Sequence, residues 1–310
     1  MSLPILGLHH VTAIAGSPPV NDAFWTGVLG MRRVKQTINF DDPGTYHLYF
    51  GDRIGRPGSL WTTFPHPAAR PRQPGAPEVA LTSLAVPGGS LRRWRTRLEE
   101  AGCGVTEHEG RLRFQDPDGT DLEIAEGDLP PAYEGVGDDG VRCLESVTLR
   151  SLRPDATGRF LTEAFGFTRQ SDDLYVCGDG AASRRVRALG GAGVAHPRLG
   201  AGSVHHVAFR LADDETQAEA LQRLPGFGVR PTPVQDRQYF HSIYFREPGG
   251  VLFELATDAP GFATDEDAGA LGQKLQLPPW LEPQRARIEA DLVPLGGTDR
   301  APARSQGGAA

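Results

Sequence analysis

The hydrophobic positions of the chain follow two alternating periodicities. Segments with apolar residues three and four apart predict four short helices, which begin at cap-type residues and end on glycine. They run from Asn21 to Gly30, Ser90 to Gly102, Asp155 to Gly166 and Asp213 to Gly226. A strand-like run precedes each helix, and several β-rich runs follow it. The preceding runs are HHVTAIA from His9, LTSLAV from Leu81, ESVTLRS from Glu145 and HHVAFRL from His205. The pattern predicts one unit of strand, helix and about three strands, used four times.

The ends of two units support this repeat. FQDPDGTDLEIA from Phe114 matches FREPGGVLFELA from Phe245 column by column. In both, a PxG turn precedes a strand that carries a glutamate at the same offset, Glu123 or Glu254. We therefore predict an α+β fold of four βαβββ modules.

Domain boundaries follow from the repeat and from composition. Modules 1 and 2 occupy residues 5–127, and modules 3 and 4 occupy residues 141–258. The Gly/Asp/Pro-rich residues 128–140 are typical of a linker. Residues 259–295 are predicted to form a docked C-terminal tail with a late helix. Residues 296–310 are predicted to be disordered.

Composition narrows the class of protein. The 310 residues are 39% hydrophobic and 23% charged, as in soluble globular proteins. No apolar run approaches the ~20 residues of a membrane span. The N-terminus lacks the basic segment and cleavage site of a signal peptide. A net charge of −7 argues against nucleic acid as a partner. The three cysteines form no CxxC pair, which argues against disulfides and zinc–thiolate sites and favours the cytoplasm.

Two adjacent histidine pairs stand out in the sequence. His9-His10 and His205-His206 both open the first strand of a module. Because neighbouring strand residues face opposite sides of a sheet, we expect one histidine of each pair to point into the sheet's cup. Its neighbour should point elsewhere or lie behind it. A polar strand end would explain one such pair, but two pairs at equivalent repeat positions favour a shared role.

Glu254 adds a carboxylate to this set. It lies in the apolar run VLFELAT, where an unpaired carboxylate is costly to bury. A salt bridge to an arginine would satisfy it, and so would a metal ion held with two histidines. Two imidazoles and one carboxylate form the facial triad of non-haem Fe(II) enzymes. In the other modules, Glu123 is kept while the histidine columns hold Ser146 and, approximately, Ser83, so a second cup should be metal-free.

These features together resemble the vicinal oxygen chelate superfamily, which includes glyoxalase I, bleomycin-resistance proteins and type I extradiol dioxygenases. The segment 243–254, IYFREPGGVLFE, resembles the extradiol signature. Arg237 stands where catechol-cleaving members carry a histidine. With LHHVT, YHLYF, the turn near Gly58 and GFATDEDAGALG, the chain resembles the hydroquinone-cleaving branch over nearly residues 6–293.

The resemblance implies a set of site residues. It makes the metal ligands His10, His206 and Glu254, and it places five more residues around the substrate and oxygen: His9, Thr12, His205, Arg237 and Tyr244. Since one ligand lies in module 1 and two in module 4, these modules must share one cup of two cupped mixed sheets. His47, in a strand, is more typical of a packed or hydrogen-bonded histidine.

The implied function is an Fe(II)-dependent ring-cleaving dioxygenase that inserts O₂ into an aromatic diol, a substituted or plain hydroquinone. Mn(II) accepts the same ligands. One alternative is a glyoxalase-like metal-dependent isomerase or lyase, whose fourth ligand finds no match here. Another is a non-catalytic protein that binds aromatic or antibiotic ligands. The sequence leaves open the ring substituents, ortho or para placement of the hydroxyls, the acid–base residue and whether the chain forms a homo-oligomer.

Overall fold

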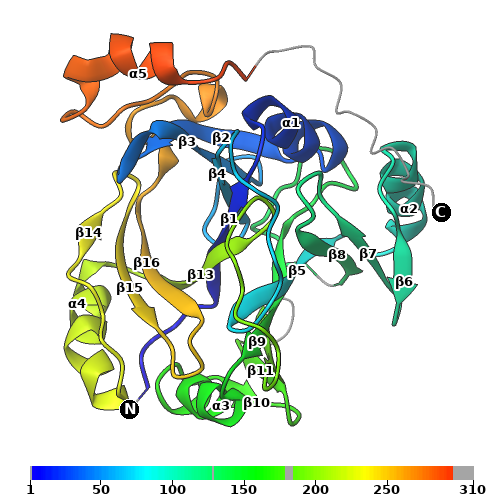
Figure 1. Ribbon diagram of the computed structural model, residues 1–310, viewed down its shortest axis with the longest axis vertical. Helices are drawn as coiled ribbons and strands as arrows, with labels where there is room; N and C mark the ends of the chain where they lie inside the picture. The colour runs from blue at the N-terminus through cyan, green and yellow to red at the C-terminus, as the bar shows by residue number, and fades with distance from the viewer. Residues whose placement is uncertain (1, 128, 179–183, 296–310) are drawn as a thin grey trace.

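The computed structural model describes residues 2–127, 129–178 and 184–295, which contain two eight-stranded sheets (Figure 1). The first has the order β14-β15-β16-β13-β1-β4-β3-β2. Its strands are β1 (Leu8–Ala15), β2 (Arg32–Asn39), β3 (Asp42–Gly51), β4 (Leu60–Pro65), β13 (Val204–Leu211), β14 (Gln235–Asp236), β15 (Phe240–Arg246) and β16 (Leu252–Pro260). Modules 1 and 4 therefore share this sheet, as predicted.

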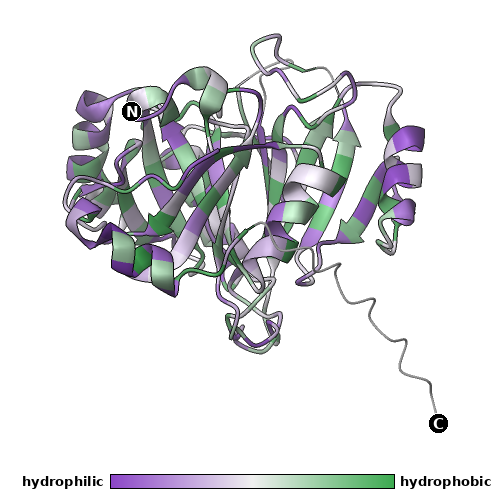
Figure 2. Ribbon diagram, turned by 90° about the horizontal axis from the view of Figure 1, so that it is seen from above, coloured by the Kyte–Doolittle hydropathy of each residue, from purple (hydrophilic) through white to green (hydrophobic). Residues whose placement is uncertain are grey.

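The second sheet joins modules 2 and 3 in the order β10-β11-β12-β9-β5-β8-β7-β6. Its strands are β5 (Glu78–Val86), β6 (Thr106–His108), β7 (Arg111–Gln115), β8 (Asp121–Glu126), β9 (Cys143–Ser151), β10 (Thr168–Arg169), β11 (Leu174–Cys177) and β12 (Arg184–Gly190). In each sheet the opening strands of two modules pair antiparallel at the centre, and each pairs on its other side with a parallel strand. The two halves lie side by side in Figure 2. This arrangement confirms the predicted α+β fold of cupped mixed sheets.

Four helices fill the helical place in the four modules: α1 (Pro18–Ala23), α2 (Leu91–Glu100), α3 (Pro154–Glu163) and α4 (Asp214–Arg223). The prediction that the first begins at Asn21 is wrong. It begins after Ser17 and continues as the π-helical turn η1 (Phe24–Val28). Asn21 lies buried inside it and accepts a hydrogen bond from Thr63 (2.7 Å), so its amide serves packing instead of capping. Asp213 does cap α4, in a capping box with Thr216.

Two hydrophobic clusters hold the chain together. The larger contains the buried faces of both sheets and their helices, including the stacked rings of Trp25 and Trp61 (centroids 4.6 Å apart). The smaller lies on the first sheet and includes Tyr49, Phe240 and Phe262. Because it joins β3, β15 and the segment after β16, the smaller cluster ties the tail to the inner face of that sheet.

The tail runs along β2 and then crosses above β2 and β3 (Figure 1). It contains η4 (Phe262–Thr264), η5 (Ala268–Ala270), η6 (Glu282–Gln284) and α5 (Arg285–Asp291). Outside the tail, a further short helix, η3 (Leu224–Phe227), follows α4. Lys35 is completely buried between Asp265 (2.6 Å) and Glu266 (2.5 Å). At Gly272 φ is +72°, and a Cβ there would lie 2.1 Å from the carbonyl oxygen of Arg33, so only glycine fits.

The domain boundaries given above remain predictions, and residues 296–310 lie outside the described residues. Cys103, Cys143 and Cys177 are all free thiols. Among the described residues, no helix is long and apolar enough to cross a membrane.

We predict that Lys35→Ala loosens the tail. The substitution leaves two carboxylates near β2 without their cation, so the free energy of unfolding should fall by about 3–5 kcal/mol. Urea unfolding measures this. The matched control is Arg285→Ala, which breaks partly exposed pairs with Glu282 and Glu289 and should cost under about 1 kcal/mol. Equal losses for both variants would contradict a specific role of Lys35.

Candidate metal centre

A β-bulge sets the position of the first histidine pair. In the pairing of β1 with β13, Leu8 lies opposite Phe209 and His10 opposite Ala208, so His9 is an extra residue. A bulge interrupts the alternation of a strand and redirects a side chain. Nδ1 of His9 lies 2.9 Å from Nδ1 of His10, and its Nε2 lies 3.2 Å from the carbonyl oxygen of Thr257. The two neighbouring side chains therefore do not face opposite sides of the sheet. They contact each other, and His9 lies behind His10.

A second bulge, in β13, positions the other histidine pair in the same way. Thr12 lies opposite His206 and Ala13 opposite Val204, so His205 is the extra residue of β13. Nδ1 of His205 lies 2.8 Å from Nδ1 of His206. Each strand thus presents one histidine inward and supports it with the other.

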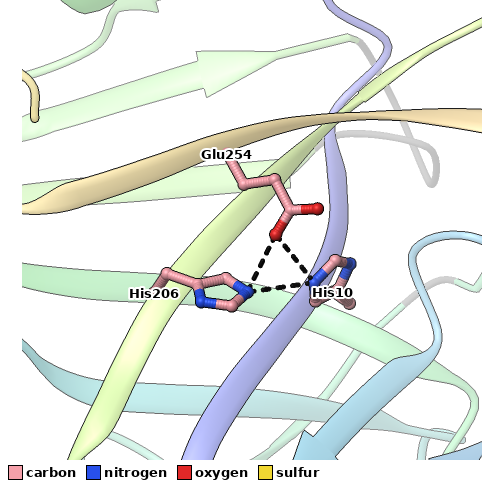
Figure 3. A group of neighbouring side chains, drawn as sticks. All are labelled: His10, His206 and Glu254. Carbon is pink, nitrogen blue, oxygen red and sulfur yellow. Dashed lines mark hydrogen bonds and ion pairs between the residues drawn. The ribbon is translucent and has the colours of Figure 1, made fainter. Parts of the chain in front are cut away.

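His10, His206 and Glu254 come together from the neighbouring strands β1, β13 and β16 (Figure 3). Oε2 of Glu254 lies 2.8 Å from Nε2 of His206 and 3.2 Å from Nε2 of His10, and the two nitrogens are 3.2 Å apart. All three side chains are buried. The structure therefore brings together the three residues predicted as metal ligands.

The donor atoms fit a metal ion. Oε2 of Glu254 is buried and receives no properly directed hydrogen bond, although both imidazoles are close. Its other oxygen, Oε1, accepts a hydrogen bond from Ser242 (2.5 Å). An unsatisfied buried carboxylate oxygen is costly unless a cation binds it. Two imidazole nitrogens and one carboxylate oxygen are ligands that first-row divalent metals accept.

The electrostatics favour the ligating forms of His206 and Glu254. Burial lowers the pKa of His206, despite the nearby Glu254. Burial alone would raise the pKa of Glu254, but His10 and His206 outweigh it and hold that pKa well below its usual range. Burial also lowers the pKa of His9 to about 3 and of His205 to about 4. At neutral pH the outer histidines are therefore uncharged and the carboxylate is ionised.

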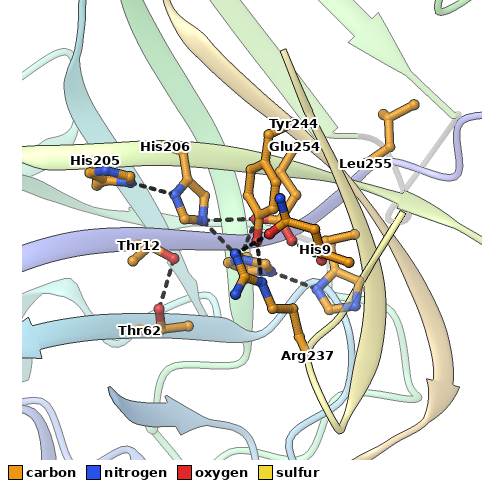
Figure 4. A network of polar contacts seen from close by, with 12 residues as sticks. His9, Thr12, Thr62, His205, His206, Arg237, Tyr244, Glu254 and Leu255 are labelled. Carbon is orange, nitrogen blue, oxygen red and sulfur yellow. Dashed lines mark hydrogen bonds and ion pairs between the residues drawn. The ribbon is translucent and has the colours of Figure 1, made fainter. Parts of the chain in front are cut away.

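Tyr244 and Arg237 lie beside His206 and Glu254 (Figure 4). Tyr244 is opposite Glu254 in the β15–β16 pairing, and its ring centroid is 5.6 Å from that of His206. Nε of Arg237 donates to the Tyr244 hydroxyl (3.2 Å), and Nη1 donates to Asp41 (3.0 Å). Burial raises the pKa of Tyr244 well above its usual value, so its hydroxyl keeps its proton. The ion pair with Asp41 is therefore only one of the contacts of Arg237.

A chain of hydrogen bonds crosses the same sheet from β1 to β3. Thr12 contacts Thr62 (2.8 Å), Thr62 contacts Nε2 of His47 (2.9 Å), and Nδ1 of His47 contacts the hydroxyl of Tyr49 (2.8 Å). The sequence predicted Thr12 as a site residue and His47 as a packed or hydrogen-bonded histidine, and its contacts confirm the latter. Thr62 and Tyr49 were missed. The repeat could have found Thr62, because the strand registers give it the place in module 1 that Glu254 has in module 4.

The second sheet repeats the bulges without the imidazoles. Ala80 and Glu145 are its extra residues, so Leu81 stands where the first sheet has His10, and Ser146 where it has His206. The approximate match of Ser83 to the histidine column is therefore wrong by two residues. Ser83 is instead the equivalent of Thr12.

Comparison with known proteins places this geometry in a family. The family model for the Glyoxalase/Bleomycin resistance protein/Dioxygenase superfamily matches residues 144–255. MhqO of Bacillus subtilis, provisionally named a ring-cleaving dioxygenase, is 42% identical over 95% of this chain and 98% of its own. This chain belongs to that superfamily, among its ring-cleaving dioxygenases. A chlorohydroquinone/hydroquinone 1,2-dioxygenase of Sphingobium indicum is 34% identical over 91% of this chain and 95% of its own.

One solved structure agrees with the dioxygenase assignment, and another shows the same fold. A Bacillus subtilis protein provisionally described as a dioxygenase superposes with a TM-score of 0.86 at 42% identity, covering 94% of this chain and 98% of its own. Maize glyoxalase I superposes with a TM-score of 0.60 at 15% identity, covering 81% of this chain and 92% of its own, which shows the shared fold alone.

We predict that the metal-free dioxygenase loses stability as the pH falls below about 6.5. His9 and His205 stay neutral in the folded chain down to pH about 3 and 4, while in the unfolded chain they protonate near 6.5. The unfolded state then binds more protons, so the free energy of unfolding decreases with falling pH in this window. Urea midpoints between pH 7.5 and 5 measure the effect.

The control for this pH dependence is His205→Phe. Removing one depressed imidazole should reduce the slope of unfolding free energy against pH by up to one proton per molecule. An unchanged slope in this variant would contradict the assignment of the effect to the outer histidines.

Proposed function

We propose that this chain binds a divalent metal through His10, His206 and Glu254 and uses it to cleave the ring of a hydroquinone with O₂. The metal is Fe(II), with Mn(II) as the alternative for the same ligands. The observation that supports this most directly is the buried Oε2 of Glu254, which lies between two imidazole nitrogens without a directed hydrogen bond. The substrate class comes from the named activity of the Sphingobium relative.

A bound metal of this kind supplies open positions for the diol and O₂, and it lowers the pKa of a coordinated hydroxyl. The protein residues then hold and move protons around the substrate. Tyr244 keeps its proton and donates a hydrogen bond to a substrate oxygen. Arg237 contacts Tyr244 and holds anionic oxygen through its remaining N–H groups. His205, neutral at working pH, lies behind His206 and takes up a proton through it.

The inner face of the first sheet also favours a para-diol over an ortho-diol. Thr12 is two residues beyond His10 on the same strand face, about 6.6 Å along β1. That separation is comparable to the span of a six-membered ring with an oxygen at each end. The Thr12–Thr62–His47 chain can therefore bind the hydroxyl that points away from the three metal ligands.

Aromatic side chains lie beside the proposed ligands. The ring centroid of Phe240 lies 5.1 Å from that of His9 and 5.3 Å from that of His10. Tyr49 packs against Phe240 and Phe262 (6.3 and 5.0 Å). Flat apolar walls beside polar ends suit an aromatic ring with two hydroxyls.

The alternatives make different demands on the site. A glyoxalase-like isomerase would use a fourth protein ligand, and the described group contains three. A non-catalytic binding protein would not require Glu254 for function. We also propose that the protein works in the cytoplasm, where its three free thiols would stay reduced.

The first functional prediction is O₂ consumption by Fe(II)-loaded protein with hydroquinone or methylhydroquinone. Glu254→Ala should lower the rate at least about 100-fold, because it removes a proposed metal ligand, which costs more than the 10–100-fold typical of the ligands' hydrogen-bond partners. An oxygen electrode and ultraviolet spectra of the product measure this. The matched control is Glu123→Gln, which changes the equivalent carboxylate of the second sheet and should keep the activity.

Two results would contradict the proposed function. Consumption of O₂ with catechol alone would keep ring cleavage but reject the hydroquinone class. No consumption with any diol, by protein that retains one metal ion per chain, would favour the glyoxalase-like alternative.

The second functional prediction concerns Thr62→Val, which removes a hydroxyl without changing the shape of the side chain. It should raise KM for hydroquinone about 5–10-fold, because one hydrogen bond at the far end of the ring is lost. Its KM for catechol should stay within about twofold. Steady-state O₂ uptake with both substrates measures the difference. An equal effect on both substrates would contradict the placement of Thr62 at the distal hydroxyl.

A further inference from the structure

The second sheet has a cup of its own that the ring-cleavage chemistry does not use. Its concave face, over β5, β7, β8, β9 and β12, holds a cleft of about 930 Å³. Leu81 and Ser146, the counterparts of the inner histidines, line this cleft. It is therefore the pseudo-symmetric equivalent of the proposed metal cup, built from different chemistry.

Arginines line the walls of this cleft in a repeated pattern. Residues 111–113 of β7 read Arg-Leu-Arg, and residues 185–187 of β12 read Arg-Val-Arg. The middle residue of each triplet is buried in the core, so strand alternation turns both arginines of each triplet to the cup face. All four arginines line the cleft.

Two glutamates fix three of these arginines across the floor of the cup. Glu145 accepts a hydrogen bond from Arg185. It also accepts two from Arg111, at 3.0 and 3.3 Å. Glu123 accepts from Arg111 (2.8 Å) and Arg113 (2.9 Å). Arginines and glutamates alternate along this series of ion pairs. Its three guanidiniums and two carboxylates together carry a net charge of +1. Neutralising the two carboxylates would require only two guanidiniums.

Within this series of ion pairs, the positive groups are more exposed than the negative ones. Glu109, Asp121 and Asp173 also line the cleft, and the last two pair with Arg72 and Arg187. The side chains of Glu123 and Glu145 are 4% and 11% exposed, whereas those of Arg113 and Arg185 are 42% and 38% exposed. Arg113 donates through Nε alone and Arg185 through Nη1 alone. Their other N–H groups have no hydrogen-bond partner among the residues that the structure describes. A guanidinium held in place with unused N–H groups is suited to a planar, two-oxygen anion.

We propose that this cup binds a small organic anion, whose carboxylate or phosphate groups are held by Arg113 on one side and by Arg185 on the other. The cleft is larger than an inorganic ion requires, and Leu81, Leu174 and Leu189 line it beside the arginines. The ligand therefore has an apolar body as well as anionic groups. This site is separate from the metal ligands, so its test does not depend on the proposed ring cleavage.

Isothermal titration of the full-length, metal-loaded protein tests the proposal with three probes: cis,cis-muconate, its uncharged dimethyl ester and inorganic phosphate. Muconate should bind one-to-one, and the affinity should decrease with added salt. The ester should bind at least about tenfold more weakly, since it cannot form charge-assisted hydrogen bonds. Phosphate that binds more tightly than muconate at the same arginines would assign a phosphate-bearing ligand.

Variants locate the binding. Arg113→Leu and Arg185→Leu should each weaken muconate binding about tenfold or more. Arg185→Lys keeps the positive charge but loses the two-pronged geometry of the guanidinium. Its affinity for muconate should lie between that of the leucine variants and that of the unmodified protein. The matched control is Arg169→Leu, an exposed arginine of the edge strand β10 in the same sheet, which should bind normally.

Three outcomes would overturn the proposal. They are no binding of either anion, binding that persists in both leucine variants, and binding that is lost in Glu254→Gln. The last would place the anion in the metal cup instead. Circular dichroism and urea midpoints of each variant separate a lost site from a lost fold.

Discussion

The antiparallel pairing of β1 with β13 is the contact on which the proposed site depends. It joins two strands that are almost two hundred residues apart in the chain and places modules 1 and 4 in one sheet. Each strand carries a bulge, at His9 in one and at His205 in the other. Without the bulges, neighbouring histidines would face opposite sides of the sheet, and neither inner imidazole would have a second one behind it.

The cost of burying charge explains the rest of the arrangement. A carboxylate and two imidazoles face one another inside the sheet, and a cation would satisfy the oxygen between them. The outer histidines and Ser242 contact the remaining polar atoms of these groups and leave the donor atoms aimed inward. In the second sheet, guanidiniums satisfy the equivalent carboxylate, Glu123, directly. Each sheet thus buries a carboxylate at the equivalent position, and the groups available to neutralise its charge differ between the two sheets.

Much of this could be predicted from the sequence because the module repeats. The four opening strands, the four helices and the match of Glu123 with Glu254 all follow from periodicity and spacing. The sharing of one cup by modules 1 and 4 followed from requiring His10 and Glu254 to meet. The start of the first helix was missed, because Asn21 is a strong cap residue whose amide is used in packing.

Other features depended on register, which local patterns do not specify. The match of Ser83 to the histidine column was wrong because a bulge at Ala80 displaces the register of β5. Tyr49 was missed because its importance comes from contacts with residues of other strands. The arginine chain of the second cup was also invisible, since Arg111 and Arg185 meet only through Glu145, from a third strand.

The central claim is that one metal ion binds between His10, His206 and Glu254. A crystal structure of Fe(II)-loaded protein, with anomalous diffraction recorded on both sides of the iron edge, tests it most directly. The account predicts one anomalous peak per chain, bounded by Nε2 of the two histidines and Oε2 of the glutamate. A peak elsewhere, or an intact site without a peak in protein that has bound iron, would contradict it.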